Sequence, residues 1–373
     1  MNRDRILVIV FLCLTAILYW WPTGFEQKID PNSLRSRGRV VEVDNSEVQQ
    51  LGIVKVGEQS LTVKLLDGPH KGQTVNAVNQ LLGKLEIDKM FEPGDTALVV
   101  LTQDSQGEIV YANPQDHYRL HVEIILFVLF AALLLVFGGL TGAKALLSFV
   151  FAALAIWKIL IPYFLKGYDP LWVALGVVSL LTAVIVFLVG GLNRKGLTAF
   201  LGALAGVATA CVLAYVFTDL FHLHGAVKPF AETLLYTGYA HLNLRKIFVA
   251  AVFIASSGAM MDLAMDVAAS MDEIARKIPN ISRKEAALSG LRVGRAVVGT
   301  MTTTLLFAYS GGYITLLMVF MAQGVPLANL FNLIYVSAEI LNTLVGSFGL
   351  VTVAPFTAVI GAMIFGRPAG EKA

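Results

Sequence analysis

The chain has 373 residues, of which 56% are hydrophobic and 14% are charged. Its mean hydropathy of +0.71 excludes a soluble protein with one core and indicates several membrane crossings. The formal net charge of +2 hides a segregation, because residues 26–119 hold 10 Lys and Arg against 14 Asp and Glu. No basic run with interleaved aromatic residues occurs, so the sequence does not predict nucleic-acid binding.

The first apolar run, Ile6 to Trp21, follows Arg3 and Arg5. This pattern is typical of a signal peptide or of an uncleaved anchor. No A-x-A cleavage site follows the run, and its aromatic end is typical of an interfacial belt. The sequence therefore favours an N-terminal transmembrane anchor over residues 1–25, with a cleaved signal peptide as the alternative.

Residues 26–119 have the pattern of a small all-β domain. Short runs rich in β-branched residues alternate with turn signals such as Asp67-Gly68-Pro69 and Pro93-Gly94-Asp95. The clearest predicted strands are Arg39–Val43, Gly52–Val56, Leu61–Leu66 and Ala97–Thr102. About five such strands predict a small barrel of OB-like type.

Residues 120–366 predict a transmembrane helical bundle, followed by a tail at 367–373. Each apolar run is near the roughly 20 residues that span hydrocarbon. The predicted spans are Val122–Phe137, Ala145–Ile161, Leu171–Leu192, Leu197–Phe217, Ile247–Ala269, Val297–Met321 and a last region, Leu330–Phe365. Gly346, Gly349 and Pro355 interrupt the last region, which predicts a broken helix or a helix pair. The expected fold is an α-helical polytopic membrane protein with an anchor, about seven further spans and an extracytoplasmic β domain.

Lysines and arginines in short loops predict the orientation, because they accumulate on the cytoplasmic side. One side receives Arg3, Arg5, Lys144, Arg194, Lys195, the cluster from Arg276 to Arg295, Arg367 and Lys372. The other side receives fewer: Lys166, Lys228, Arg245 and Lys246. The sequence therefore predicts a cytoplasmic N-terminus and a β domain on the opposite side of the membrane.

Two carboxylates, Asp262 and Asp266, lie in the apolar run from Ile247, just after Ser257. A charged side chain at the bilayer centre costs about 3 kcal/mol or more, so it usually faces a partner, a cavity or a transport path. Residues four apart share one helix face, and such a pair suits proton or cation binding. Asp266 lies near the end of the run, so an interfacial position in contact with water is the alternative for it.

Glu339 and Asn342 form a second candidate pair, three residues apart and ahead of the glycines at 346 and 349. A carboxylate and an amide before a glycine break resemble the unwound binding segments of transporters. The alternative is a buried glutamate that pairs with another helix and fixes the packing.

Thr302, Thr303 and Thr304 are the third candidate, because hydroxyls at successive positions include some that face inward and line a polar path. The alternative is interhelical contact through small residues, which Gly202-x-x-x-Gly206 also predicts. His222, His224 and His241 are weak candidates for a metal site, since no other spacing is diagnostic.

Familiar enzyme signatures are absent from the sequence, including H-E-x-x-H, G-x-x-x-x-G-K-[ST] and G-x-S-x-G. We therefore expect neither enzymatic activity nor a cofactor. An intramembrane aspartyl-type enzyme is the least favoured class. Paired catalytic aspartates converge from two elements, whereas Asp262 and Asp266 lie on one helix turn.

The same motifs resemble the YibE/F-like family of bacterial multipass membrane proteins. The residues that carry the resemblance are Ser257 to Asp262, Glu273, Gly294-Arg295, Gly299 to Thr302, Thr304-Leu305, Ala308-Tyr309, Glu339-Ile340, Gly346-Ser347, Gly349-Leu350, Pro355 and Thr357. An Asn usually stands in the family where this chain has Thr303. The resemblance implies an integral membrane protein with an extracytoplasmic β domain, and it implies no particular activity.

Two functional hypotheses follow. In the first, Asp262 and Glu339 form a proton- or cation-coupled site of a secondary transporter or transport component. In the second, the chain does not transport, and its β domain docks another envelope protein. The expected partners besides the lipid bilayer are thus an envelope protein or a second copy of the chain.

Overall fold

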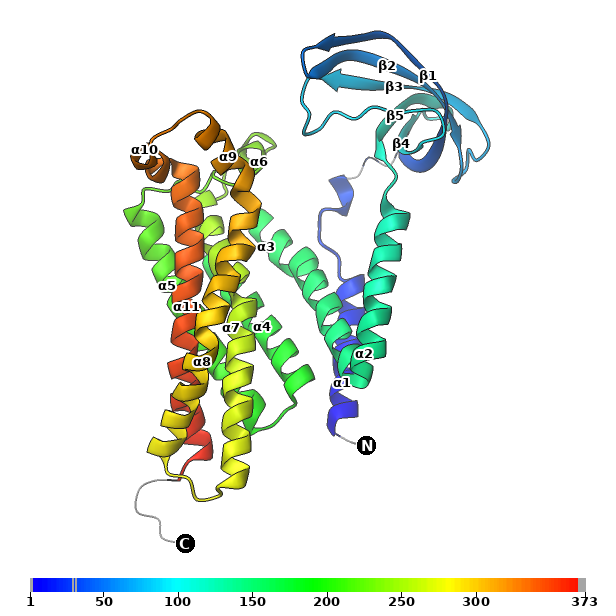
Figure 1. Cartoon of the computed structure of the whole chain (residues 1–373). Helices are drawn as coiled ribbons and strands as arrows, with labels where there is room; N and C mark the ends of the chain where they lie inside the picture. Colours follow the sequence, from blue (N-terminus) through cyan, green and yellow to red (C-terminus); the bar gives the residue numbers. More distant parts are fainter. Residues whose placement is uncertain (1–2, 29, 31, 368–373) are drawn as a thin grey trace. The chain divides into compact units, whose positions relative to one another are not determined.

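The computed structural model describes residues 3–28, 30 and 32–367 (Figure 1). The chain divides into two compact units: residues 24–133, and residues 1–23 together with 134–373. The first unit contains the β domain, and the second contains most of the apolar helices.

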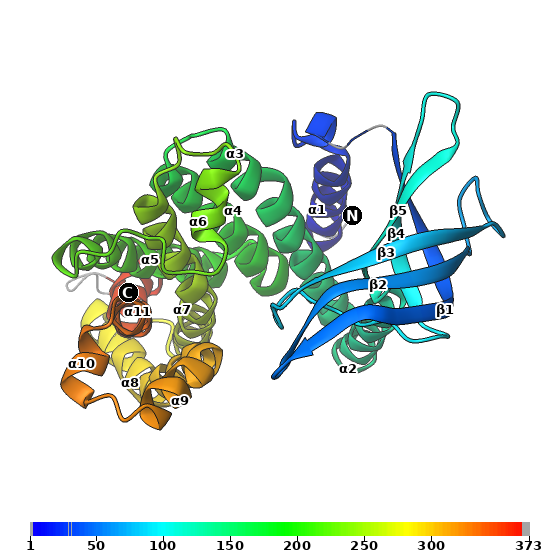
Figure 2. The ribbon, with the colours of Figure 1, turned by 90° about the horizontal axis from the view of Figure 1, so that it is seen from above.

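The β domain is a nearly closed antiparallel barrel of five strands (Figure 2). Its elements are η1 (Glu26–Lys28), β1 (Ser33–Leu51), β2 (Val54–Leu65), β3 (Thr74–Leu82), β4 (Thr96–Gln103) and β5 (Ile109–His117). The strand order is β3-β2-β1-β4-β5. The predicted small barrel is confirmed, while its OB-like type stays a prediction. The predicted strand Gly52–Val56 begins two residues too early, because Gly52 and Ile53 form the turn between β1 and β2, and its remaining residues belong to β2.

The long strand β1 serves both halves of the barrel. It pairs with β2 and with β4, and its register with β2 shifts between Val40 and Glu42. A β-bulge of this kind bends a strand and increases its twist. A Cβ at Gly38 would lie 2.3 Å from Val63 Cγ1, so only glycine lets β1 cross the core this closely.

Asp67, in the turn between β2 and β3, ties that turn to β1. Its carboxylate accepts hydrogen bonds of 2.7 Å from the Ser36 hydroxyl, from the Arg37 backbone N–H and from the Arg37 guanidinium. Burial raises the pKa of this carboxyl, but the hydrogen bonds from Arg37 and Ser36 outweigh burial and hold the pKa below its ordinary value of 3.8.

We expect acid to release this tie. Because the pKa of Asp67 is lowered by folding, its stabilisation is complete above about pH 4 and is lost as the pH falls through the folded-state value. Asp67→Asn should increase hydrogen exchange of β1 and β2 at neutral pH and flatten its dependence on acid. Glu86→Gln, at an exposed loop carboxylate, is the control. An unchanged acid dependence in Asp67→Asn would contradict the assignment.

The second unit is helical. Its elements are α1 (Arg3–Trp20), the greater part of α2 (Leu120–Ala155), a π-helix η2 (Ile156–Leu160), α3 (Ile161–Leu165), α4 (Pro170–Gly190), α5 (Arg194–Leu220), α6 (Ala231–Tyr236), α7 (Leu244–Lys277), α8 (Arg283–Ser310), η3 (Gly311–Tyr313), α9 (Ile314–Ala322), α10 (Leu327–Asn332) and α11 (Ile334–Phe365). Six of the described stretches are long and apolar enough to cross a membrane, and a shorter apolar helix covers Ile6–Trp20. The multi-span architecture is confirmed by length and composition.

The first long apolar stretch, Leu120–Leu165, contains two of the predicted spans. Gly139 breaks α2, because its φ of 52° and ψ of −127° lie outside helical geometry. The break falls between the predicted spans Val122–Phe137 and Ala145–Ile161. A glycine is required there, since other residues seldom adopt a positive φ.

The fifth stretch differs from its prediction. The span expected over Val297–Met321 is divided between α8, which begins at Arg283, and the separate helix α9. Arg292 and Arg295 therefore lie inside α8 and not in a loop. Hydropathy missed this start because the capping residues Ser282 and Glu285, which form a capping box, lie among charged residues.

The last region is one helix, not a broken one. Helix α11 runs without interruption from Ile334 to Phe365, with Pro355 inside it. Its glycines pack against neighbouring helices: a Cβ at Gly349 would lie 2.1 Å from Met260 Cε of α7. The glycines therefore permit close packing and do not unwind the helix.

The contact between α5 and α11 is a second close seam of this kind. A Cβ at Gly202 would lie 2.1 Å from Thr357 Oγ1, and one at Gly206 would lie 2.2 Å from Val353 Cγ2. The close packing predicted for Gly202-x-x-x-Gly206 is confirmed. Such small-residue seams are typical of helices that associate in lipid.

Candidate functional site

The carboxylate of Glu339 lies near the start of α11, inside the helical unit. Its side chain is 17% exposed, and it forms an ion pair with Lys228. Lys228 belongs to the connection between α5 and α6, so the counter-ion of the half-buried glutamate comes from a connecting segment and not from a long apolar helix. The alternative from the sequence analysis placed the partner of Glu339 on another helix of the bundle, and the observed partner does not lie on one.

We call residues 221–230, which carry Lys228, the strap. Its apolar residues Leu223 and Val227 are buried in the core of the helical unit. A Cβ at Gly225 (φ 89°) would lie 2.3 Å from the backbone carbonyl of Leu244. The strap is therefore pressed onto the start of α7, and this contact brings Lys228 to Glu339.

The strap is strained near both of its ends. His222 and Phe230 have positive φ values of 52° and 60°. A left-handed conformation costs a residue other than glycine about 1–2 kcal/mol. Such strain persists only where surrounding contacts enforce it, and it is common in segments that switch.

A polar cluster, formed by Ser256 of α7, Tyr309 of α8 and Asn342 of α11, lies beside Glu339 along α11. At Gly346, one turn beyond Asn342, a Cβ would lie 3.0 Å from Ser256 Cβ and 3.4 Å from Tyr309 Oη. Tyr309 Oη and Asn342 Oδ1 are buried and have no hydrogen-bond partner among the described residues. An unsatisfied buried polar group costs about 1–3 kcal/mol. The cluster therefore contains two buried oxygens that could each form a further hydrogen bond.

Asp262 and Asp266 are not brought together with Glu339. Both lie on the exposed face of α7, while Met260 and Ser256 of the same helix face α11. Two residues beyond Met260, Asp262 points about 200° around the helix from it. Ser257 is buried, and its hydroxyl donates to the Ile254 carbonyl at 2.7 Å.

The three threonines of α8 bind their own helix. Thr302 donates to the carbonyls of Val298 and Gly299, Thr303 to that of Gly299, and Thr304 to that of Thr300. Thr303 and Thr304 are exposed, and Thr302 is half-buried. None of the three joins the cluster beside Glu339.

The candidate histidines are used within the connections. His224 Nδ1 accepts from the Ala226 N–H at 3.1 Å, and His241 Nε2 lies 3.3 Å from the Leu165 carbonyl. His222 is the strained residue of the strap. The described residues hold no group of three or more metal-ligating side chains.

The basic residues beside the strap are also paired. Arg245 binds Asp219, and Lys246 binds Asp169. Burial raises the pKa of Asp169, but the hydrogen bond and charge of Lys246, together with hydrogen bonds from the backbone N–H groups of Leu171 and Trp172, hold the pKa below its ordinary value. Arg245 and Lys246 thus have acidic partners. Their charges are neutralised locally, so they count less against the predicted orientation of the helical unit.

Residues 126–367, which include the strap, the polar cluster and all candidate carboxylates, match the family described as YibE/F-like protein. The chain belongs to the YibE/F-like family. The barrel, over residues 34–116, matches the YibE/F family N-terminal domain. No curated protein and no solved structure matches the chain.

Lys228 escaped the sequence analysis of this YibE/F-like chain, because it was counted only as an exception in the charge asymmetry. Ser256 begins the polar stretch that leads to Asp262, but no role was assigned to it. The sequence did contain a signal for Lys228. Its neighbours Val227 and Pro229 are apolar, so the lysine has few partners nearby in the chain. The contact of Tyr309 with Gly346 depends on helix packing and had no sequence signal.

Proposed function

We propose that the chain is a secondary transporter, or a transport component, in which Glu339 is the proton- or cation-coupling group. The observation that carries the proposal is a half-buried carboxylate whose ion pair comes from a strained strap. It lies along α11 from buried polar atoms that have no hydrogen-bond partner among the described residues. Intramembrane carboxylates of this kind commonly mark ion and substrate pathways. Protonation of Glu339 would release Lys228, and the strap would then uncover the polar cluster.

This proposal departs from a site shared by Asp262 and Glu339. The polar cluster supplies hydroxyl and amide oxygens from three helices, which suits binding and release. It contains no nucleophile with an adjacent base, which makes catalysis a poorer account.

We further propose that the strap lies on the extracytoplasmic side of a bacterial inner membrane. The opposite end of the unit carries the Arg and Lys residues at the end of α7, in the first half of α8 and at the start of α5. The positive-inside rule assigns that end to the cytoplasm. The polar cluster would then open outward when the strap moves.

The test is proton flux in proteoliposomes under an imposed membrane potential. Glu339→Gln keeps the shape but cannot exchange a proton, and we expect flux to fall by about tenfold or more. Glu273→Gln, at an exposed carboxylate of α7, should leave flux unchanged. Wild-type flux in Glu339→Gln, or no flux in the wild type, would remove this function.

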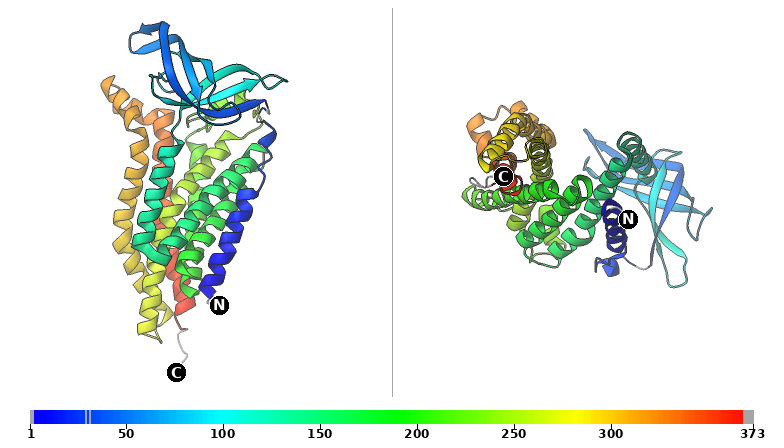
Figure 3. Two further views of the ribbon diagram at one scale, coloured as in Figure 1. Left: turned by 90° about the vertical axis from the view of Figure 1, so that its right-hand side faces the viewer. Right: turned by 90° about the horizontal axis from the view of Figure 1, so that it is seen from below.

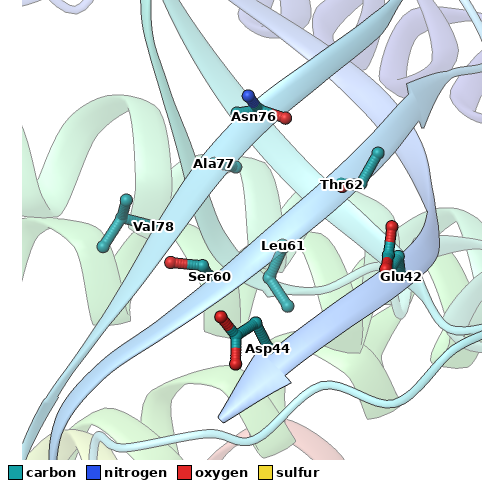
Figure 4. Close-up of a pocket in the computed structure, with 8 residues that line it drawn as sticks. All are labelled: Glu42, Asp44, Ser60, Leu61, Thr62, Asn76, Ala77 and Val78. Carbon is teal, nitrogen blue, oxygen red and sulfur yellow. The ribbon is translucent and has the colours of Figure 1, made fainter. Parts of the chain in front are cut away.

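The second candidate is docking of an envelope protein on the barrel. A pocket of about 330 Å³ is lined by Glu42, Asp44, Ser60, Leu61, Thr62, Asn76, Ala77 and Val78 (Figure 4). The hydrogen bond from the Ser46 N–H lowers the pKa of Asp44 below its ordinary value, so this pocket stays acidic and suits a basic segment. If it docks a partner, Glu42→Gln with Asp44→Asn should abolish co-purification that Glu339→Gln preserves. Unchanged co-purification in the double variant would exclude the pocket.

A further inference from the structure

One face of the helical unit carries exposed charged side chains on α7 and α8. On α7 the exposed face includes Gly258, Asp262 and Asp266. Neither carboxylate has a hydrogen bond or an ion pair with another described residue. Each would cost several kcal/mol against lipid, so protein or water must cover this face.

Helix α8 runs antiparallel beside α7, as Figures 1 and 3 both show. Two contacts fix their register: a Cβ at Gly294 would lie 3.7 Å from Val267 Cγ2, and one at Gly290 would lie 2.6 Å from Met271 Sδ. Extending this register by one residue places Arg295 at the depth of Asp266.

Arg295 is exposed on α8 and has no ion pair among the described residues. Asp266 and Arg295 thus share a depth without meeting inside one chain. Four residues further along the same register, Gly299 lies at the depth of Asp262, and it too is exposed. A Cβ at Gly258 or Gly299 would meet nothing within 4 Å. The face therefore combines opposite charges at one level with glycines that permit close helix approach.

A second copy of the chain fits this face. In a two-fold dimer whose axis is perpendicular to the membrane, every residue keeps its depth, and each contact occurs twice. We propose that the α7–α8 face is a homodimer interface in which Asp266 of each copy pairs with Arg295 of the other. The pairs neutralise all four charges at that level, and Asp262 is enclosed one turn deeper. The proposal does not depend on the transport function.

The test uses charge reversal in two differently tagged full-length chains, co-expressed and extracted in lipid nanodiscs. Asp266→Arg alone and Arg295→Asp alone should each lower the dimer fraction by about tenfold or more, because each homodimer places like charges together. Co-expression of the two variants should restore dimers that contain one copy of each. In that heterodimer the introduced arginine meets the introduced aspartate, and the native pair forms on the other side.

If dimers are restored in the mixture, Asp266 and Arg295 meet between two copies and not within one chain. Arg292→Asp, at an exposed arginine one turn away on α8, should leave the dimer intact. A wild type that is monomeric in the membrane, single variants that dimerise normally, or a mixture that stays monomeric would each overturn the proposal. Recovery of a different protein on this face in place of a second copy would overturn it as well.

Discussion

Replacing Gly202 with leucine should cost about 3 kcal/mol of stability or more, the upper part of the range for over-packed cores. Even alanine conflicts with α11, because its Cβ would lie 2.1 Å from Thr357 Oγ1 and 3.0 Å from Thr357 Cα. The backbone atom cannot rotate away, so the two helices must separate, and the effect should spread along the seam to Gly206.

Denaturant unfolding of the detergent-solubilised chain measures this effect. Gly176→Leu is the matched control, since a Cβ at this glycine of α4 would meet nothing within 4 Å. Thr357→Ala should partly restore Gly202→Ala, because it removes the hydroxyl oxygen but leaves the Cβ, 2.9 Å away. Equal stability of the two leucine variants would show that the seam is not closely packed.

Removing the positive charge of Lys228 should expose the polar cluster. The ion pair with Glu339 ties the strap to α11, and without it the strain at His222 and Phe230 favours release. The lysine side chain is 40% exposed, so solvent screening limits the stability of the pair to about 1–2 kcal/mol. In Lys228→Met, a cysteine at position 342 should react with a membrane-impermeant reagent about tenfold faster.

The labelling needs a background in which the two native cysteines, Cys13 and Cys211, are replaced. Lys166→Met is the control, because Lys166 lies over the Tyr163 ring and not beside Glu339. Glu339→Gln should speed labelling as Lys228→Met does, and the double variant should add little. Additive effects would show that the two residues act on the strap separately.

The sequence predicted the large features of this fold well. Hydropathy located the membrane-spanning stretches, and turn residues located the barrel, because both signals are local. The ends of α7 and α8 were missed, since charged residues continue a helix beyond the bilayer as readily as they end it. The glycines of α11 were misinterpreted for a related reason: a glycine that ends a helix and one that admits a neighbour look alike in sequence.

The candidate site was predicted only in part. Glu339 and Asn342 were found because polar residues are rare in apolar stretches. Lys228 and Tyr309 reach the same place from α5–α6 and α8, and this proximity depends on how helices pack. Asp262 was misplaced for the same reason. The sequence marks it as a polar residue in an apolar stretch, but it does not show that Asp262 lies on the exposed face of α7, away from the side that packs against α11.

The interlocked glycine seams also constrain how this protein can change shape. Helix α11 touches α5 and α7 where a glycine on one helix leaves room for a side chain of the other, so sliding one past another would drive side chains into backbone atoms. A rocking-bundle movement among these three helices is therefore expensive. In the proposed transporter, we therefore expect access to the interior to alternate through short elements at the rim, with the helices serving as a fixed frame.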